Sequence, residues 1–183
     1  MSDRSDGEPE DDAYGRVTDP EQWRALHDAT TRLIEELTDG CSVTRTDAVD
    51  LDPWAAGMWP GSPATRLEPR SGGSVITFTF TSHPGVMVSY GHAGSDAFPR
   101  CGCDACDEDP GEEAKRMADV VRDVVSGGFT ETRTRRRLRA DAYESRLDAH
   151  DPSGWSGRDG TVDAEANRAA VPIGTTRRPA WTS

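Results

Sequence analysis

The amino-acid sequence predicts an α+β fold: a helix, a four-stranded antiparallel meander, a second helix, and then a β extension. Two segments, residues 19–40 and 109–125, begin with an Asp-Pro pair and continue with apolar residues at helical spacing. Between them, residues 74–82 alternate in the pattern of a half-buried strand. The connections between the strand-like runs are short, which favours antiparallel pairing.

The chain of 183 residues is expected to contain one domain and two less ordered ends. Half of residues 1–12 are acidic, and Gly and Pro are also present, which predicts a disordered tail. Residues 13–147 contain the periodic segments and predict a single α+β domain. Residues 148–183 are rich in Gly, Pro, Asp and Arg, and predict a loop-rich C-terminal extension.

The first helix has clear start and stop signals. Asp19 is placed to cap it, Pro20 occupies the first helical position, and Gln22 follows three residues after the cap. Apolar side chains then recur on one face: Trp23, Leu26, Leu33, Ile34 and Leu37. Asp39-Gly40 ends the helix, because Gly adopts the left-handed conformation of a helix C-terminus.

The four strands of the meander are read from alternation and from the turns between them. They are expected at residues 41–47, 65–70, 74–82 and 86–92. In the third strand, Ile76, Phe78 and Phe80 share one face and predict the core side. Residues 51–63 are rich in Gly and Pro and are expected to form a loop with Trp anchors.

The second helix repeats the logic of the first, with Asp109 as its cap, Pro110 at the first position and Glu112 at the third. Ser126-Gly127-Gly128 ends it. Residues 129–147 then contain β-forming residues, which predict the β extension of the domain.

The net charge of −12 and the isoelectric point of about 4.7 disfavour binding to nucleic acid or anionic lipid, because the overall field repels phosphate. The charge does not exclude a protein partner.

No apolar run approaches the ~18 residues that a membrane span needs. The N-terminus lacks the apolar segment of a signal peptide. We therefore expect a cytoplasmic protein with reduced thiols.

Three of the four cysteines, Cys101, Cys103 and Cys106, stand close together in the stretch FPRCGCDACDED. The CxxC spacing lets two thiolates bind one tetrahedral ion, and Cys101 adds a third ligand through a turn at Gly102. The three cysteines are therefore candidate zinc ligands. A single CxxC is a weaker pattern than the paired motifs of common structural zinc sites.

The fourth zinc ligand has no obvious place in the sequence. Cys41 and His92 are the main candidates, and His83 is a further one. Two other interpretations of the cluster stay open. Cys103 and Cys106 can form a redox pair, in which the helix N-terminus lowers the pKa of Cys106 while nearby acids disfavour a thiolate. The thiols can also be small packing residues of a tight turn.

An arginine run follows the second helix, with Arg133, Arg135, Arg137 and Arg139 on one face of a strand. This face can bind phosphate or an acidic partner, or it can be a solvated strand edge that discourages aggregation. The sequence has no HExxH, GxSxG, P-loop or GxGxxG motif. It therefore indicates no catalytic residue and no organic cofactor, which disfavours an enzyme.

Four stretches carry a resemblance to a known family: YGRVTDPEQW, HPGVMVSYG, FPRCGCDACDED and GGFTE. Over residues 13–132 the chain resembles a family of small actinobacterial proteins, domain of unknown function six-two-two-six. CGCDAC is its most specific element. The resemblance implies an intracellular bacterial protein without an assigned activity, and it carries over no catalytic residue.

The sequence therefore predicts a non-enzymatic binding or interaction module with a structural cysteine-rich turn, in which zinc is the candidate metal. The alternative is a thiol-based redox or metal-sensing protein that uses Cys103 and Cys106. The two functions differ in whether the thiols hold metal or change oxidation state.

Overall fold

The structure is a computed structural model that describes residues 13–51, 53–92, 94–135, 142–149 and 173–183. A 3₁₀ turn, Pro20–Trp23, leads into α1 (Arg24–Gly40), and α3 (Pro110–Val125) follows the main sheet. That sheet is antiparallel, with the order β1-β2-β3-β4-β5. Its strands are β1 (Val43–Asp47), β2 (Ala64–Pro69), β3 (Ile76–Phe80), β4 (Val86–Tyr90) and β5 (Gly94–Phe98). The predicted α+β class is confirmed.

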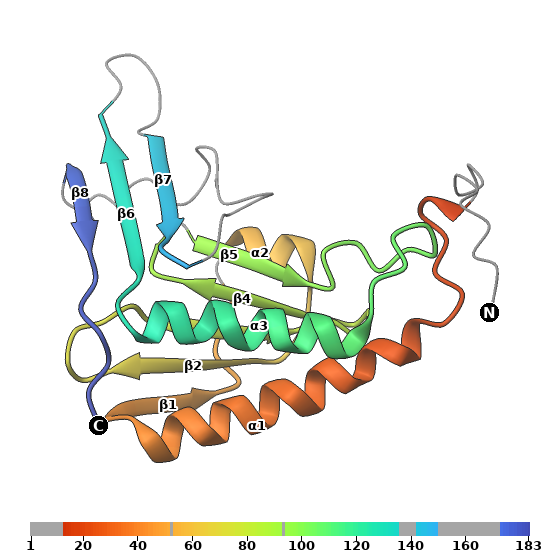
Figure 1. The fold of residues 1–183 in the computed structure, drawn as a ribbon, viewed down its shortest axis with the longest axis horizontal. Helices are drawn as coiled ribbons and strands as arrows, with labels where there is room; N and C mark the ends of the chain where they lie inside the picture. The colour runs from red at the N-terminus through yellow and green to blue at the C-terminus, as the bar shows by residue number, and fades with distance from the viewer. Residues whose placement is uncertain (1–12, 52, 93, 136–141, 150–172) are drawn as a thin grey trace, which may run out of the picture.

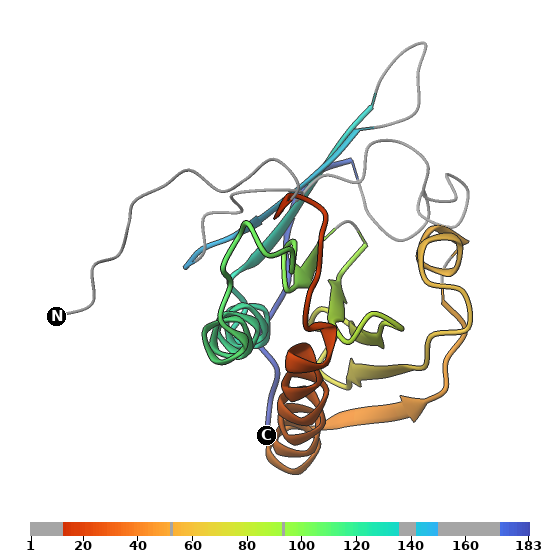
Figure 2. The same ribbon diagram turned by 90° about the vertical axis from the view of Figure 1, so that its right-hand side faces the viewer.

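The elements form two layers with a smaller sheet at one end (Figure 1). The helices α1 and α3 lie side by side on one face of the main sheet, and the short α2 (Pro53–Met58) lies on the other side (Figure 2). The second sheet has the order β7-β6-β8 and adjoins the C-terminal end of α3. It consists of β6 (Phe129–Thr134), β7 (Ala142–Leu147) and β8 (Gly174–Arg177).

The core lies between the two long helices and the main sheet. The apolar face predicted for the first helix is buried there. Ile76 and Phe78 of β3 are fully buried as predicted, while Phe80 is only partly buried and contacts the ring of His27 edge to face. His27 also bonds through Nε2 to the carbonyl of Gly85 at 2.9 Å, so α1 is fixed to the turn before β4.

The two helix starts differ in detail from each other. Asp109 caps α3 as predicted, since its carboxylate accepts hydrogen bonds from the backbone N–H groups of Gly111 and Glu112 at 2.8 and 2.9 Å. Asp19 makes no such bond, and the turn after it is 3₁₀ rather than α. The same Asp-Pro signal therefore produces a side-chain cap at one helix only.

The main sheet has five strands, one more than the four predicted. β5 pairs with β4 from Tyr90↔Gly94 to Val86↔Phe98. Its sequence, GSDAF, lacks the β-branched residues that mark strands, so it depends on pairing with its buried neighbour. The predicted loop at 51–63 likewise contains α2.

The C-terminal residues return to the core. β8 pairs with β6, and Trp181 is buried with 8% of its surface exposed. Its indole N–H donates to the carbonyl of Ser74 at 3.1 Å, and its backbone N–H donates to the carbonyl of Val125 at 2.9 Å. Gly73 makes room for the ring, because a Cβ there would lie 2.6 Å from it. Trp181 thus connects α3 with the strands of the main sheet.

The arginine run is only partly within the described residues. Arg133 lies in β6 with 7% of its surface exposed, so it is not available as a surface cation. Arg135 is exposed. Arg137 and Arg139 lie outside the described residues, as do the predicted tail of residues 1–12 and most of the predicted C-terminal extension.

Replacing Trp181 with Ala is expected to lower the free energy of unfolding by about 3–5 kcal/mol, because it leaves a cavity and an unpaired carbonyl at Ser74. Urea unfolding followed by circular dichroism measures the change. Ile173→Ala is the control in the same segment, since Ile173 is 57% exposed and should lose less than about 0.5 kcal/mol. Equal losses in the two variants would contradict the buried docking of this segment.

Candidate metal centre

The cysteine loop, residues 99–109, joins β5 to α3. Arg116 of α3 fixes the two ends relative to each other, because its guanidinium lies 4.1 Å from the ring centre of Phe98 and donates to the carbonyl of Ala97 at 2.8 Å. Gly102 has a φ of +76°. A Cβ at Gly102 would lie 2.9 Å from Pro99 and 3.3 Å from the indole nitrogen of Trp23. Glycine therefore lets the loop turn back against the start of α1.

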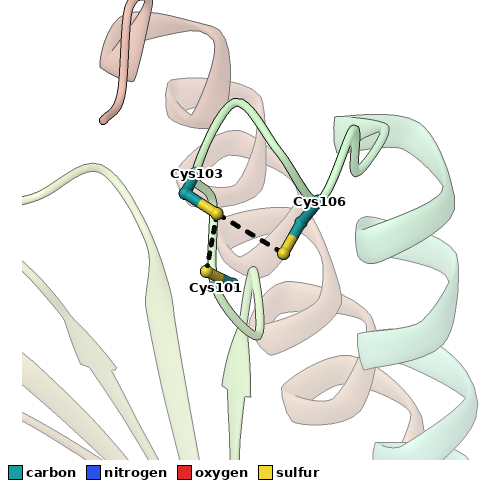
Figure 3. A group of neighbouring side chains, drawn as sticks. All are labelled: Cys101, Cys103 and Cys106. Atoms are coloured by element: carbon teal, nitrogen blue, oxygen red, sulfur yellow. Dashed lines mark hydrogen bonds between the residues drawn. The ribbon is translucent and has the colours of Figure 1, made fainter. Parts of the chain in front are cut away.

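The loop brings the three predicted metal ligands together (Figure 3). The Sγ atoms of Cys101 and Cys103 lie 3.1 Å apart, and those of Cys103 and Cys106 lie 3.4 Å apart. All three sulfur atoms lie within 4.8 Å of one another. These separations exceed the ~2.05 Å of a disulfide, and all three cysteines are free thiols. Cys103 is buried, whereas Cys101 and Cys106 are exposed.

Hydrogen bonds distribute the protons unequally over the cluster. The backbone N–H of Gly15 and the thiols of Cys101 and Cys106 donate to Cys103, which lowers the pKa of Cys103 to about 6. Donation to Cys103 raises the pKa of Cys106 to about 12. The pKa of Cys106 is thus raised rather than lowered, and its hydrogen bonds to Cys103 and Cys101 are the leading causes. The thiolate forms at Cys103, where more donors converge.

Two acidic side chains of the loop, Asp104 and Glu108, hold it together. The carboxylate of Asp104 accepts hydrogen bonds from the Arg16 Nε at 2.9 Å, the Thr18 N–H at 2.8 Å and the Thr18 hydroxyl at 2.6 Å. These bonds lower the pKa of Asp104 to about 2. The carboxylate of Glu108 accepts from the backbone N–H groups of Cys101 and Gly102 at 3.2 and 2.8 Å.

The segment of residues 13–18 completes the site, although its sequence gave no sign of this role. Besides Gly15, two of its carbonyls accept hydrogen bonds from the loop, Arg16 from the N–H of Asp104 at 2.8 Å and Ala13 from the N–H of Ala105 at 3.3 Å. These are backbone contacts across a long sequence separation. No residue type marks them in advance.

The structure does not bring the two main candidates for a fourth ligand to the cluster. Cys41 directly follows the C-terminal end of α1, whereas Gly102 of the cysteine loop lies beside Trp23 at the N-terminal end. The 17 residues of the helix separate the two ends by about 25 Å at 1.5 Å per residue. His92 lies at the β4–β5 turn, where its N–H donates to Glu131 at 2.6 Å. Cys101 follows the other end of β5, about 17 Å along the strand.

These features define a small α+β protein with a three-thiol cluster in the loop between its main sheet and its second long helix. The chain belongs to the family of unknown function DUF6226, whose model matches residues 2–182. The family resemblance that the sequence motifs carry is thereby confirmed.

No curated protein and no solved structure matches the chain. In the part of the chain that the structure describes, the helices are too short or too polar to cross a membrane.

Asp104→Asn is expected to destabilise the protein in a pH-dependent way. The pKa of Asp104 is about 2 in the folded protein, compared with its usual 3.8. A carboxylate with a lowered pKa contributes stability above pH 3.8, and this contribution is lost as the pH falls through about 2. The difference between wild type and variant should therefore be full at pH 7 and shrink steadily below pH 4. Urea unfolding across this range measures it.

Asp28→Asn is the matched control, since it removes an exposed carboxylate from α1. It should change the free energy of unfolding by less than about 0.5 kcal/mol. A pH-independent loss in Asp104→Asn, or a loss equal to that of the control, would contradict the role of the Asp104 carboxylate in joining residues 13–18 to the loop.

Proposed function

We propose that the protein binds one metal ion, zinc, through Cys101, Cys103 and Cys106. The observation that carries this proposal is the convergence of three sulfur atoms within 4.8 Å on one short loop. Sulfur atoms bound to a tetrahedral zinc lie about 3.8 Å apart, given zinc–sulfur bonds of about 2.3 Å. The thiols need to move only slightly to reach that spacing from 3.1 and 3.4 Å.

The chemistry around Cys103 supports the same proposal. Metal ligands must be thiolates, and the hydrogen bonds that lower the pKa of Cys103 favour its thiolate form. Glu108 accepts hydrogen bonds from backbone N–H groups of the loop, and Asp104 joins the loop to residues 13–18. The three cysteines are therefore held in place before a metal binds. Preorganised ligands favour metal binding because less ordering is needed.

In this proposal the protein is a non-enzymatic binding or interaction module in the cytoplasm, and the metal-bound loop is a structural part of it. The compartment suits the site, because thiols stay reduced there and available to metal. The loop joins the main sheet to α3 and contacts the start of α1, so a bound ion would stabilise the contact between these three elements.

The reduced protein is expected to retain about one zinc ion per chain after gel filtration, as measured by mass spectrometry of the metal. Cys103→Ser should weaken zinc binding by more than ~100-fold, because it removes a direct ligand. Loss of a residue that only hydrogen-bonds to a ligand costs ~10–100-fold. Cys41→Ser is the matched control and should bind zinc as the wild type does. It removes a thiol at the far end of α1.

Absence of zinc from the reduced wild type would overturn the proposal. Equal losses in Cys103→Ser and Cys41→Ser would contradict the assignment of the ligands, even if metal binds.

A second candidate function is a thiol redox switch. It is favoured by the 3.4 Å between the sulfur atoms of Cys103 and Cys106, with Cys103 as the thiolate nucleophile. In such a switch the two thiols lose two electrons and two protons to hydrogen peroxide and form one disulfide, while the peroxide becomes two waters.

The redox function predicts that one equivalent of peroxide lowers the count of free thiols from four to two, and that dithiothreitol restores it. Cys103→Ser should abolish the paired loss, because Cys103 belongs to both close sulfur pairs, whereas Cys41→Ser should leave it unchanged. Thiol titration under denaturing conditions measures the count. If bound zinc also prevents the loss of free thiols, metal binding is the primary function. A loss of thiols that dithiothreitol does not restore would contradict the switch.

A further inference from the structure

A cavity of about 190 Å³ lies beside the cysteine loop. It opens between the β3–β4 turn, the paired ends of β4 and β5, and Trp59, which follows α2. Cys101 lines this cavity and is also one of the three clustered thiols. No residue of α1 lines this cavity.

The cluster leaves one coordination position without a protein ligand. Zinc takes four ligands, and sites with three protein ligands bind water or a substrate at the fourth. Among the described residues, no His, Cys, Asp or Glu joins the three sulfur atoms within 4.8 Å. Since Cys101 and Cys106 are exposed, a molecule from solution can approach the ion beside them.

The lining of the cavity indicates the chemistry of that molecule. Its walls are largely apolar, with Met87, Phe98 and Pro99 among them. Arg100 is the permanent cation in the lining, and its guanidinium suits the two oxygens of a carboxylate. The positive charge of Arg100 also offsets the negative charge that three thiolates and an anionic ligand would place around one Zn²⁺. The volume is below the ~300–1,000 Å³ of drug-sized sites, so the ligand must be small.

We propose that this cavity receives a small organic carboxylate, whose acidic group completes the coordination of the metal ion and whose apolar body lies against Met87 and Phe98. This inference rests on the proposed function, since it requires the metal to be bound by the three cysteines.

The test uses full-length protein loaded with Co²⁺, which occupies tetrahedral zinc sites and reports its ligands in visible absorption. Sulfur-to-cobalt charge-transfer bands report the cysteines, and the d–d bands report the fourth ligand. Butyrate is the probe, and propylamine is the control with the same propyl group and the opposite charge. Butyrate is expected to shift the d–d bands saturably, whereas propylamine leaves them unchanged.

Two variants test the cavity itself. Arg100→Gln should weaken the butyrate effect by about 10-fold or more, because a charge-assisted hydrogen bond is lost. Arg70→Gln is its control, since Arg70 is exposed and does not line the cavity. Ala97→Phe should abolish the butyrate effect by filling the cavity, while the charge-transfer bands persist. Ala97 is exposed on the edge strand β5, so the larger ring can be accommodated without disturbing the core.

The outcomes separate the two proposals. If the protein retains no cobalt, the proposed function fails and the inference fails with it. If charge-transfer bands form but butyrate has no effect, or acts equally in Ala97→Phe, the inference alone is overturned. A change of the d–d bands in ligand-free His83→Ala would assign the fourth position to His83, which also lines the cavity, and would likewise overturn the inference.

Discussion

The carboxylate of Asp104 is the contact on which the site depends. It gathers three hydrogen bonds from Arg16 and Thr18, and so holds residues 13–18 across the cysteine loop. That placement brings the N–H of Gly15 to the sulfur of Cys103. The thiolate, the loop and the start of α1 are therefore one connected unit. A carboxylate close to a thiol ordinarily disfavours the thiolate. Asp104 instead favours the thiolate of Cys103, because Arg16 neutralises the charge of Asp104 and because Asp104 positions the N–H of Gly15.

The fold places this unit at a junction. The loop begins at the buried Phe98 of β5 and ends at the cap of α3, and Arg116 fixes these ends to each other. Gly102 turns the loop against Trp23 at the start of α1. The buried indole nitrogen of Trp23 has no hydrogen-bond partner among the described residues, so apolar packing holds it there. A metal ion bound to the loop would thus connect both long helices to the edge of the main sheet, and metal binding would be coupled to stability.

Much of the fold could be predicted from the sequence, because helix caps, apolar periodicity and strand alternation are local signals. β5 escaped prediction because its residues have low strand propensity and pair only through β4. The docking of Trp181 escaped because a single aromatic residue does not reveal its distant partner, Ser74. For the site, the spacing of three cysteines predicted their convergence. The donor from Gly15 and the roles of Asp104 and Glu108 depend on long-range backbone geometry, which spacing does not encode.

The central claim is that three cysteines of one loop hold a metal ion with one position left for a ligand from outside the protein. X-ray absorption spectroscopy of the zinc-loaded protein tests it most directly, because it counts the atoms bound to the metal and identifies them by type. The account predicts three sulfur atoms at about 2.3 Å and one oxygen atom at about 2.0 Å, without the outer-shell scattering that a histidine ring would add. Four sulfur atoms, which require Cys41 or a second chain, would contradict it, as would zinc bound by oxygen and nitrogen atoms alone.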